Sequence, residues 1–318
     1  MNSIASGIRD SDFFLRRRDL LAAGFTDAQI RGALGSHSIF RVRQGWYSVP
    51  DAPQAAIDAI RVGGRLTATS ALESYGLPVP RRPNLHVAVV RTSSRLRSRS
   101  DRRARLGAAD GVLVHWVDRP GSGGSVWRVS LGDALLAVLV AESRDIAVAC
   151  ASAIMRRTNF TVAELTAVFA RAPEHCGPWL ALASPLDDSH GETFFRLWMM
   201  DVGHVFEQQF AFPGVGRVDF RVGPHTFVEI DGAQHDPDWI GESRSSYEGD
   251  HDRDTTVAIG GGTTLRYTYR QLYGDWARVL AAVERTIADD LALTAYRARH
   301  PFRLRVHSKR RRSARKAT

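Results

Sequence analysis

Acidic side chains that could share a divalent cation gather between residues 191 and 235. Glu192 falls on a predicted helix, on the same face as apolar side chains three and seven residues further along. Two short strands of alternating polarity follow, one around Asp219 and one around Glu229. If these strands pair as a hairpin about Gly223-Pro224, both acids lie on one face of the sheet.

Carboxylates gathered on one face repel each other unless a positive charge neutralises them. A hard divalent cation, Mg²⁺ or Mn²⁺, does this with oxygen ligands and suits phosphate chemistry. Glu192, Asp219 and Glu229 are therefore candidate metal ligands. The alternative is structural: Asp219 is then solvated between two arginines, and Glu192 pairs with Arg196 one turn further along the helix.

Five segments within residues 189–287 carry a family resemblance. They read GETFFR, RVDF, VEIDGAQH, a D-R-D cluster and TTLRYTYRQL. They resemble the restriction-endonuclease-like PD-(D/E)XK domain, nearest to its very-short-patch-repair (Vsr-like) branch and to similar actinobacterial proteins. The resemblance implies that Glu192, Asp219 and Glu229 bind Mg²⁺. It also implies DNA contacts from Arg253 and Arg266.

One position departs from the family pattern. The lysine of the family's E-x-K motif falls at Asp231 in this chain, so the cation of the standard site is missing there. His235 is the candidate to supply part of that role, because Vsr-like enzymes use a histidine after the same strand. We expect Asp231 and His235 to complete the catalytic set, while the departure leaves open whether the domain cuts DNA or only binds it.

The first 50 residues show the element order of a winged helix-turn-helix. A Thr26–Gln29 capping box opens a predicted helix over residues 27–34, and residues 39–49 predict a hairpin turning at Gln44-Gly45. The segment also resembles the N-terminal domain of abortive-infection type IV antitoxins, which makes 27–34 a recognition helix. The predicted DNA contacts are Gln29 and Arg31 on this helix, and Arg41 and Arg43 on the wing. The alternative is a small helical domain whose arginines are only solvated.

Between these two ends the sequence predicts an α/β scaffold. Strands are expected at residues 85–90 and 112–117, helices over much of 130–183, and an arginine-rich loop at 91–105. The expected fold class is an α/β multidomain chain that ends in a restriction-endonuclease-like mixed sheet flanked by helices. Near the end of the chain a strand is expected at residues 264–269 and a helix at 276–287. The expected boundaries are 1–50 for the winged helix, 51–185 for the middle scaffold, 186–295 for the nuclease-like domain and 296–318 for a basic tail.

Composition narrows the choice of partner. The chain has 318 residues, 44% of them hydrophobic, and a formal net charge of +9, which suits a polyanion such as DNA. Its first residues lack a signal-peptide pattern, and no stretch approaches the ~20 apolar residues that span a bilayer. We expect a cytoplasmic, nucleoid-associated protein with no membrane partner and with reduced cysteines, and a homodimer is left open.

Two functions fit these residues. The first is a DNA-binding protein whose Mg²⁺-dependent endonuclease domain hydrolyses phosphodiester bonds in DNA repair or defence. The second is a non-catalytic, antitoxin-like transcriptional regulator whose nuclease fold has lost its activity together with its lysine. Cleavage of plasmid DNA that depends on Asp219 and Glu229 separates the two.

Overall fold

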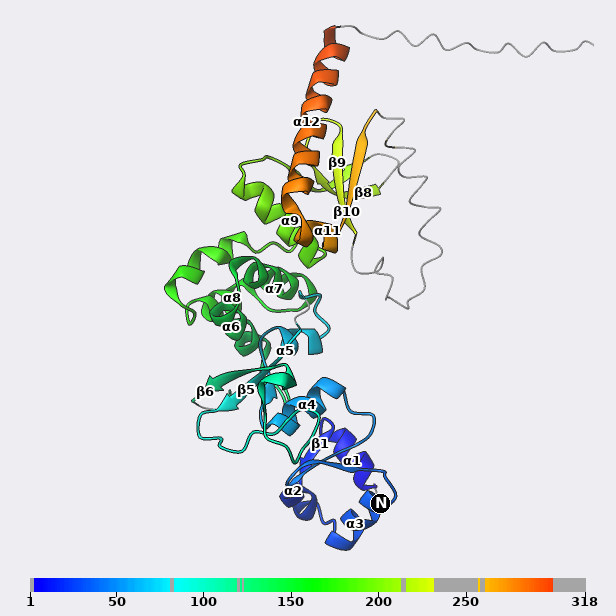
Figure 1. Cartoon of the computed structure of the whole chain (residues 1–318), viewed down its shortest axis with the longest axis vertical. Coiled ribbons are helices and arrows are strands. Elements are labelled where there is room, and N and C mark those ends of the chain that lie inside the picture. Colours follow the sequence, from blue (N-terminus) through cyan, green and yellow to red (C-terminus); the bar gives the residue numbers. More distant parts are fainter. Residues whose placement is uncertain are drawn as a thin grey trace, which may run out of the picture. The chain divides into compact units, whose positions relative to one another are not determined.

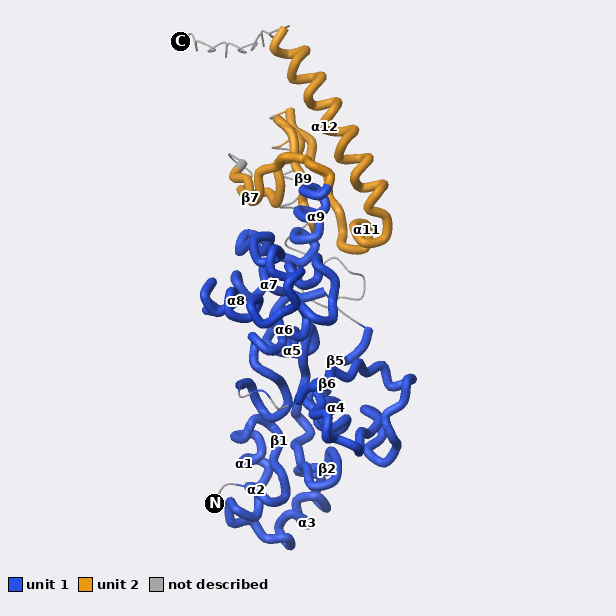
Figure 2. Tube along the Cα trace, turned by 90° about the vertical axis from the view of Figure 1, so that its left-hand side faces the viewer, with its two compact units in different colours: residues 1–201 blue, residues 202–318 orange. Residues whose placement is uncertain are grey.

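The computed structural model describes residues 3–80, 83–118, 121, 123–212, 216–231, 257 and 261–299. The chain divides into two compact units, Met1–Asp201 and Val202–Thr318, which we call unit 1 and unit 2 (Figure 2). The finer division into four parts stays a prediction. His235 and Arg253 lie outside the described residues.

Unit 1 opens with a small helical module closed by a three-stranded sheet. Its elements are α1 (Ile4–Asp10), β1 (Phe14–Arg16), α2 (Arg17–Ala22), α3 (Asp27–Gly35), β2 (Phe40–Arg43) and β3 (Trp46–Ser48). The strands are antiparallel in the order β1-β3-β2. The β2–β3 hairpin turns at Gln44-Gly45 as predicted, and Gly45 takes a φ of 78°, which suits glycine. Strand β1 was not predicted.

The start of α3 follows the sequence closely. The Thr26 hydroxyl accepts a hydrogen bond from the Gln29 amide at 3.3 Å, and the Gln29 side chain accepts one from the Thr26 amide at 2.8 Å. This reciprocal capping box satisfies two backbone donors that the first helical turn leaves without intrahelical partners. The predicted helix over residues 27–34 is thereby confirmed.

The rest of unit 1 is a small sheet followed by packed helices (Figure 1). Its elements are α4 (Gln54–Val62), β4 (Arg65–Leu66), α5 (Ala68–Ser74), β5 (Leu85–Val90), the 3₁₀ turn Ala108–Asp110, β6 (Val112–Val117), α6 (Leu131–Ala141), α7 (Arg144–Arg157), α8 (Val162–Phe169), the 3₁₀ segment Glu174–Leu182 and α9 (His190–Asp201). The sheet order is β4-β5-β6, with β5 and β6 parallel. Both predicted strands and the helical run are confirmed.

Helix α9 is held against α7 within unit 1. The Trp198 indole nitrogen donates to an Asp145 carboxylate oxygen at 2.7 Å. Phe194 and Trp198 stack, and Phe195 and Met199 are fully buried. The apolar stripe that predicted a helix at this place therefore forms one side of a packed core.

Unit 2 is a four-stranded mixed sheet with helices. Its elements are β7 (Glu207–Phe212), β8 (Gly216–Arg221), β9 (Thr226–Asp231), β10 (Thr263–Thr268), α11 (Tyr269–Gly274) and α12 (Trp276–Arg299). The strand order is β10-β9-β8-β7, antiparallel except for the β10–β9 pair, which is parallel. Helix α12 packs along β9 and β10, with Val279 and Val283 buried (Figure 1).

Two expectations for unit 2 need correction. Helix α12 runs to Arg299, although the sequence predicted its end near residue 287. Tyr269 was assigned to a strand, but it begins α11, because Thr268 and Gln271 form a capping box that ends β10.

None of the described helices is both long and apolar enough to cross a lipid bilayer. Cys150 and Cys176 are buried and do not form a disulfide with each other.

Candidate active site

The sheet of unit 2 splits between its two central strands. The regular pairing of β8 with β9 covers Phe220 opposite Val228 and Arg221 opposite Phe227. Strand β8 stays paired with β7 as far as Gly216, and β9 stays paired with β10 as far as Asp231. The central strands β8 and β9 therefore pair next to the hairpin turn, at Phe220 and Arg221, and separate on the side of Phe220 that is further from the turn. We call this point the fork.

Asp219 lies at the fork. If the β8–β9 register continued, Asp219 would stand opposite Glu229, and the next backbone bond would link Ile230 to β8. Instead, the Ile230 amide donates to an Asp219 carboxylate oxygen at 2.8 Å. A side chain thus takes the place of a backbone acceptor, and its negative charge is held where the strands separate.

Glu229 lies on β9 beside a cation from the next strand. Arg266 on β10 is its partner in the parallel register, and the two side chains form an ion pair with an Nη2–Oε2 distance of 3.2 Å. Only 13% of the Glu229 side chain and 25% of the Arg266 side chain are exposed. The fork therefore joins two carboxylates and one guanidinium in a largely buried place.

Asp231 ends β9 opposite Thr268. It is half-buried, at the edge of the described part of the strand. Burial also raises the pKa of the neighbouring Tyr267 phenol, so this hydroxyl stays protonated at neutral pH. The arrangement places Asp219, Glu229 and Asp231 on adjacent strands of unit 2.

Glu192 has a structural role at the start of α9 in unit 1. Its carboxylate accepts a hydrogen bond from the Asp188 amide at 3.0 Å, and its own amide donates to the Ser189 hydroxyl at 3.2 Å. The side chain is buried, and an acid in the first helical turn is favoured by the helix dipole. The sequence analysis did not anticipate this capping role, although Ser189 and Glu192 have the spacing of a capping box.

Arg196 pairs with Asp187. Its guanidinium donates to both Asp187 carboxylate oxygens, at 2.9 and 2.7 Å, and to the Leu182 carbonyl at 2.7 Å. The structural alternative had matched Arg196 with Glu192 instead. A bidentate arginine–carboxylate pair this deeply buried fixes the loop that leads into α9.

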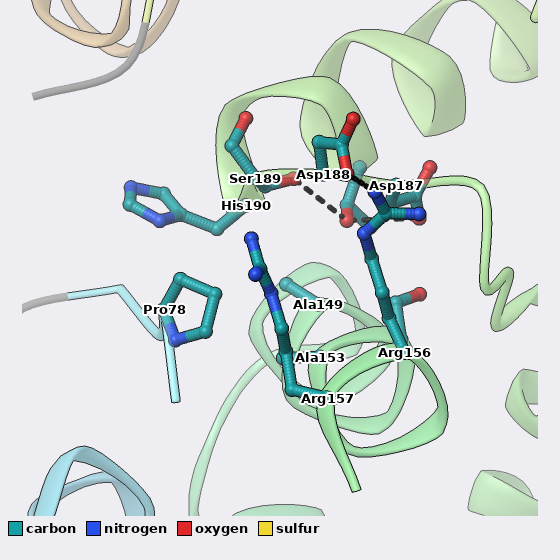
Figure 3. A pocket seen from close by; sticks show the side chains of 11 residues that line it. Pro78, Ala149, Ala153, Arg156, Arg157, Asp187, Asp188, Ser189 and His190 are labelled. Atoms are coloured by element: carbon teal, nitrogen blue, oxygen red, sulfur yellow. Dashed lines mark hydrogen bonds and ion pairs between the residues drawn. The ribbon is translucent and has the colours of Figure 1, made fainter. Parts of the chain in front are cut away.

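A small cleft of unit 1 borders the same loop (Figure 3). Arg156 forms an ion pair with Asp188, while Arg157 extends from α7 into the cleft beside His190. Pro78 closes the cleft on the other side. We assign no chemistry to this cleft, because Asp187 and Asp188 are engaged by Arg196 and Arg156 in holding the loop before α9.

The predicted DNA contacts of unit 1 differ in exposure. Arg31 and Arg41 are exposed, and the Arg41 guanidinium lies 5.7 Å from the centre of the Tyr47 ring. Gln29 is engaged in the capping box of α3. Arg43 is half-buried and donates to the Ile60 and Arg95 carbonyls.

The structure does not bring all the predicted site residues together. Within the described ranges, no three histidine, cysteine, aspartate or glutamate side chains converge as a metal site. His235 and Arg253, outside those ranges, keep their predicted roles only as predictions. The sequence analysis missed the Glu229–Arg266 pair. The sequence showed only that Glu229 and Arg266 each lie on a predicted strand. It did not show that the two strands are neighbours or in which register they pair.

Comparisons with known proteins find distant likenesses among solved structures. No family model and no curated protein matches the chain. The homing endonuclease I-Bth0305I catalytic domain shares 15% identity over 31% of this chain and 95% of its own, with a TM-score of 0.27. The RV2827C protein from Mycobacterium tuberculosis shares 11% identity over 62% of this chain and 80% of its own, with a TM-score of 0.31. Values this low assign neither a fold nor an activity.

Proposed function

We propose that the protein binds DNA and that unit 2 hydrolyses phosphodiester bonds at the fork. The observation that carries this proposal is the position of Asp219 where β8 and β9 part, with its carboxylate on the Ile230 amide and Glu229 across the fork. The sheet of unit 2 is then a restriction-endonuclease-like, Vsr-like domain, and the reaction serves DNA repair or defence.

The acids at the fork suit Mg²⁺ or Mn²⁺. Mg²⁺ is commonly held by one or two carboxylates together with waters and substrate phosphate oxygens, so Asp219 and Glu229 suffice as protein ligands. When bound, the ion would polarise the scissile phosphate and lower the pKa of a water. Glu192 belongs to unit 1, and its part in such a site stays a prediction.

Arg266 could replace the positive charge of the lysine that the family pattern places at position 231. Its guanidinium already lies 3.2 Å from Glu229, so a positive charge stands among the acids although Asp231 occupies the lysine position. We propose that Arg266 stabilises the negative charge that develops on the phosphate. His235 is the proposed group that orients or deprotonates the attacking water.

The opening module of unit 1 is the proposed DNA anchor. Helix α3 and the β2–β3 hairpin have the order of a recognition helix and wing, as in type IV antitoxins. Arg31 and Arg41 are exposed, and in this proposal they contact phosphates, which position a protein on DNA without reading its sequence. A nucleoid location and a homodimer remain predictions.

The test is cleavage of supercoiled plasmid by the full-length protein in Mg²⁺ or Mn²⁺. Asp219→Asn keeps an acceptor for the Ile230 amide, and Glu229→Gln keeps one for Arg266, so both variants should fold. We expect nicking to fall at least tenfold in each. Glu207→Gln, which changes an exposed acid on β7, is the matched control and should cut like the wild type.

A non-catalytic regulator is the second candidate, and one observation favours it. Both central acids already have partners in the structure: Asp219 holds the Ile230 amide and Glu229 holds Arg266. In a regulator these contacts would only stabilise the sheet. Plasmid that stays intact with all four proteins, together with duplex binding by each of them, would favour this candidate over the nuclease.

A further inference from the structure

Unit 1 contains a groove that the proposed nuclease function does not use. It encloses ≈1190 Å³ between the β2–β3 hairpin, the end of α4, the β5–β6 strands and α6. The side chains that matter for its chemistry are Arg43, Trp46, Arg65, His115, Trp116 and Val140. Small-molecule sites usually measure about 300–1,000 Å³, so the size of this groove suits a segment of a longer ligand.

Two arginines that line the groove, Arg43 and Arg65, donate to carbonyls, whereas Arg171 forms an ion pair with Asp133 in the same lining. Arg43 donates to the Ile60 and Arg95 carbonyls, and Arg65 donates to the Gly121 carbonyl at 3.1 Å. Within the described residues, neither guanidinium forms an ion pair. Burial is the main cause that lowers the pKa of both groups; Arg97 adds to the effect at Arg43, while Asp133 and Tyr75 oppose it in part at Arg65, so the positive charge of both groups is costly there. An anion in the groove would offset that cost.

The Arg43 guanidinium lies against the end of α4, where it faces a glycine. Gly63 ends α4 with a φ of 115°, a backbone conformation that favours glycine, and a Cβ atom there would lie 2.1 Å from the Arg43 Nη1 atom. The inward direction of Arg43 removes this arginine from the outer face of the wing.

Aromatic rings line the same groove. Trp116 on β6 is 45% exposed, and the Arg16 guanidinium stacks over the Trp46 ring at 4.7 Å. The ring of His115 is oriented by a hydrogen bond to buried His86, with 3.0 Å between His115 Nε2 and His86 Nδ1. The other ring nitrogen of His86 lies 3.7 Å from a Glu142 carboxylate oxygen. Burial is the main cause that lowers the pKa of His115, so its ring is neutral at pH 7.

We propose that this groove binds a single strand of nucleic acid. The phosphates of the strand would lie near Arg43 and Arg65, and one of its unpaired bases would stack on Trp116. A duplex does not fit this chemistry, because its bases are stacked on one another and present no free face to an indole ring. The inference rests on the proposed function for its DNA partner and adds the form of DNA that unit 1 holds.

The test compares a labelled oligothymidylate with a labelled duplex, by fluorescence anisotropy with the full-length protein at moderate salt. Trp116→Ala removes the proposed stacking platform, and Leu113→Ala, at the same 45% exposure on β6 but outside the groove lining, is its control. Val140→Glu adds a negative charge to the groove. Val162→Glu adds one at a residue of α8 that is equally exposed and does not line the groove.

We expect Trp116→Ala and Val140→Glu to weaken single-strand binding about tenfold, with duplex binding unchanged and both controls like the wild type. Equal single-strand affinity in all five proteins would overturn the inference. An equal loss for single strand and duplex would also overturn it, since the groove would then be a general DNA surface. If the wild-type protein binds single strands through the groove but does not nick plasmid DNA, the nuclease proposal is refuted and the groove inference stands.

Discussion

At the scale of single residues, buried charges in this protein are matched to specific partners. Asp187 and Arg196 are 1% and 7% exposed and meet through two hydrogen bonds, while the Thr193 hydroxyl donates to the same carboxylate at 2.9 Å. Removing one partner of such a pair leaves the other charged and out of contact with water, which costs more than the pair itself contributes.

Asp187→Ala should therefore lower the free energy of unfolding by about 3–5 kcal/mol. The measurement is urea denaturation of the full-length protein. Asp201→Ala is the comparison, because Asp201 pairs with Arg144 at a half-exposed place and its loss should cost less than about 1 kcal/mol. Similar losses in the two variants would contradict the role assigned to the buried pair.

Asp290 on α12 links the helix to the sheet of unit 2. Burial alone would raise the pKa of this carboxyl. Hydrogen bonds from the His225 amide at 2.7 Å, the Thr226 hydroxyl at 2.9 Å and the His225 ring outweigh burial and hold the pKa below its usual value. A pKa that is lower in the folded state means that the ionised form stabilises the fold.

This contribution is present above the unfolded pKa, about 3.9, and is lost as the pH falls through the lower folded pKa. We expect the protection factors of the β9 amides, which are corrected for the intrinsic pH dependence of amide exchange, to fall from about pH 4 downward in the wild type. Asp290→Asn should show lower protection factors at pH 7, and these should depend less on pH in that window. Asp289→Asn, a change at the exposed neighbouring acid, should behave like the wild type.

At the scale of helices and strands, close backbone packing decides which glycines are replaceable. Gly64 lies in the turn between α4 and β4, and a Cβ atom on it would lie 2.1 Å from the Ala88 carbonyl oxygen and 2.7 Å from a Val87 methyl, both on β5. A Cβ atom on Gly32, within α3, would meet nothing within 4 Å. The first glycine is required for packing, and the second only weakens its helix.

Gly64→Ala should destabilise the protein by about 1–3 kcal/mol through overpacking. Gly32→Ala should stabilise it by about 0.5–1 kcal/mol, because alanine is the better helix former. Thermal denaturation of both variants beside the wild type measures the two effects. A stabilised Gly64→Ala protein would show that the turn after α4 does not approach β5 as closely as described.

The sequence predicted the elements whose signals are local. The Thr26–Gln29 capping box, the turn at Gln44-Gly45 and the alternation around Asp219 each lie within about ten residues, and each corresponds to an observed helix, hairpin or strand. On β9 the alternation holds only from Val228 onward, because Thr226 and Phe227 are also buried. The short strand β1 and the added turns of α12 have no such local signal.

The partners in the candidate site could not be predicted in the same way. Glu229 meets Arg266 across the parallel β9–β10 pair, whose register depends on a long connection with no fixed spacing in the sequence. His225 meets Asp290 across 65 residues for the same reason. Periodicity shows which face a side chain occupies, whereas tertiary packing decides which side chain stands opposite.

At the scale of the whole molecule, charge governs the proposed partnership with DNA. A formal net charge of +9 favours association with a polyanion, and most of that attraction comes from the release of cations condensed on the DNA. Exposed arginines on α3 and the β2–β3 hairpin add defined phosphate contacts to this general attraction.

Duplex affinity should therefore fall linearly with salt on logarithmic axes. Arg31→Ala should reduce the slope by about one if Arg31 contacts a phosphate. Arg285→Ala removes another exposed arginine, on α12, and should leave the slope nearer the wild-type value. Gel-shift titrations over a range of salt measure both slopes. Affinity that does not depend on salt would exclude phosphate contact by either unit.

Direct binding of Mn²⁺ tests the central claim most closely, since the nuclease proposal requires the fork to hold a divalent ion. Electron paramagnetic resonance of free Mn²⁺ during titration of the full-length protein reports the number of bound ions. We predict one site that is lost in Asp219→Asn and in Glu229→Gln and kept in Glu207→Gln. Equal Mn²⁺ binding by the wild type and all three variants would contradict the account.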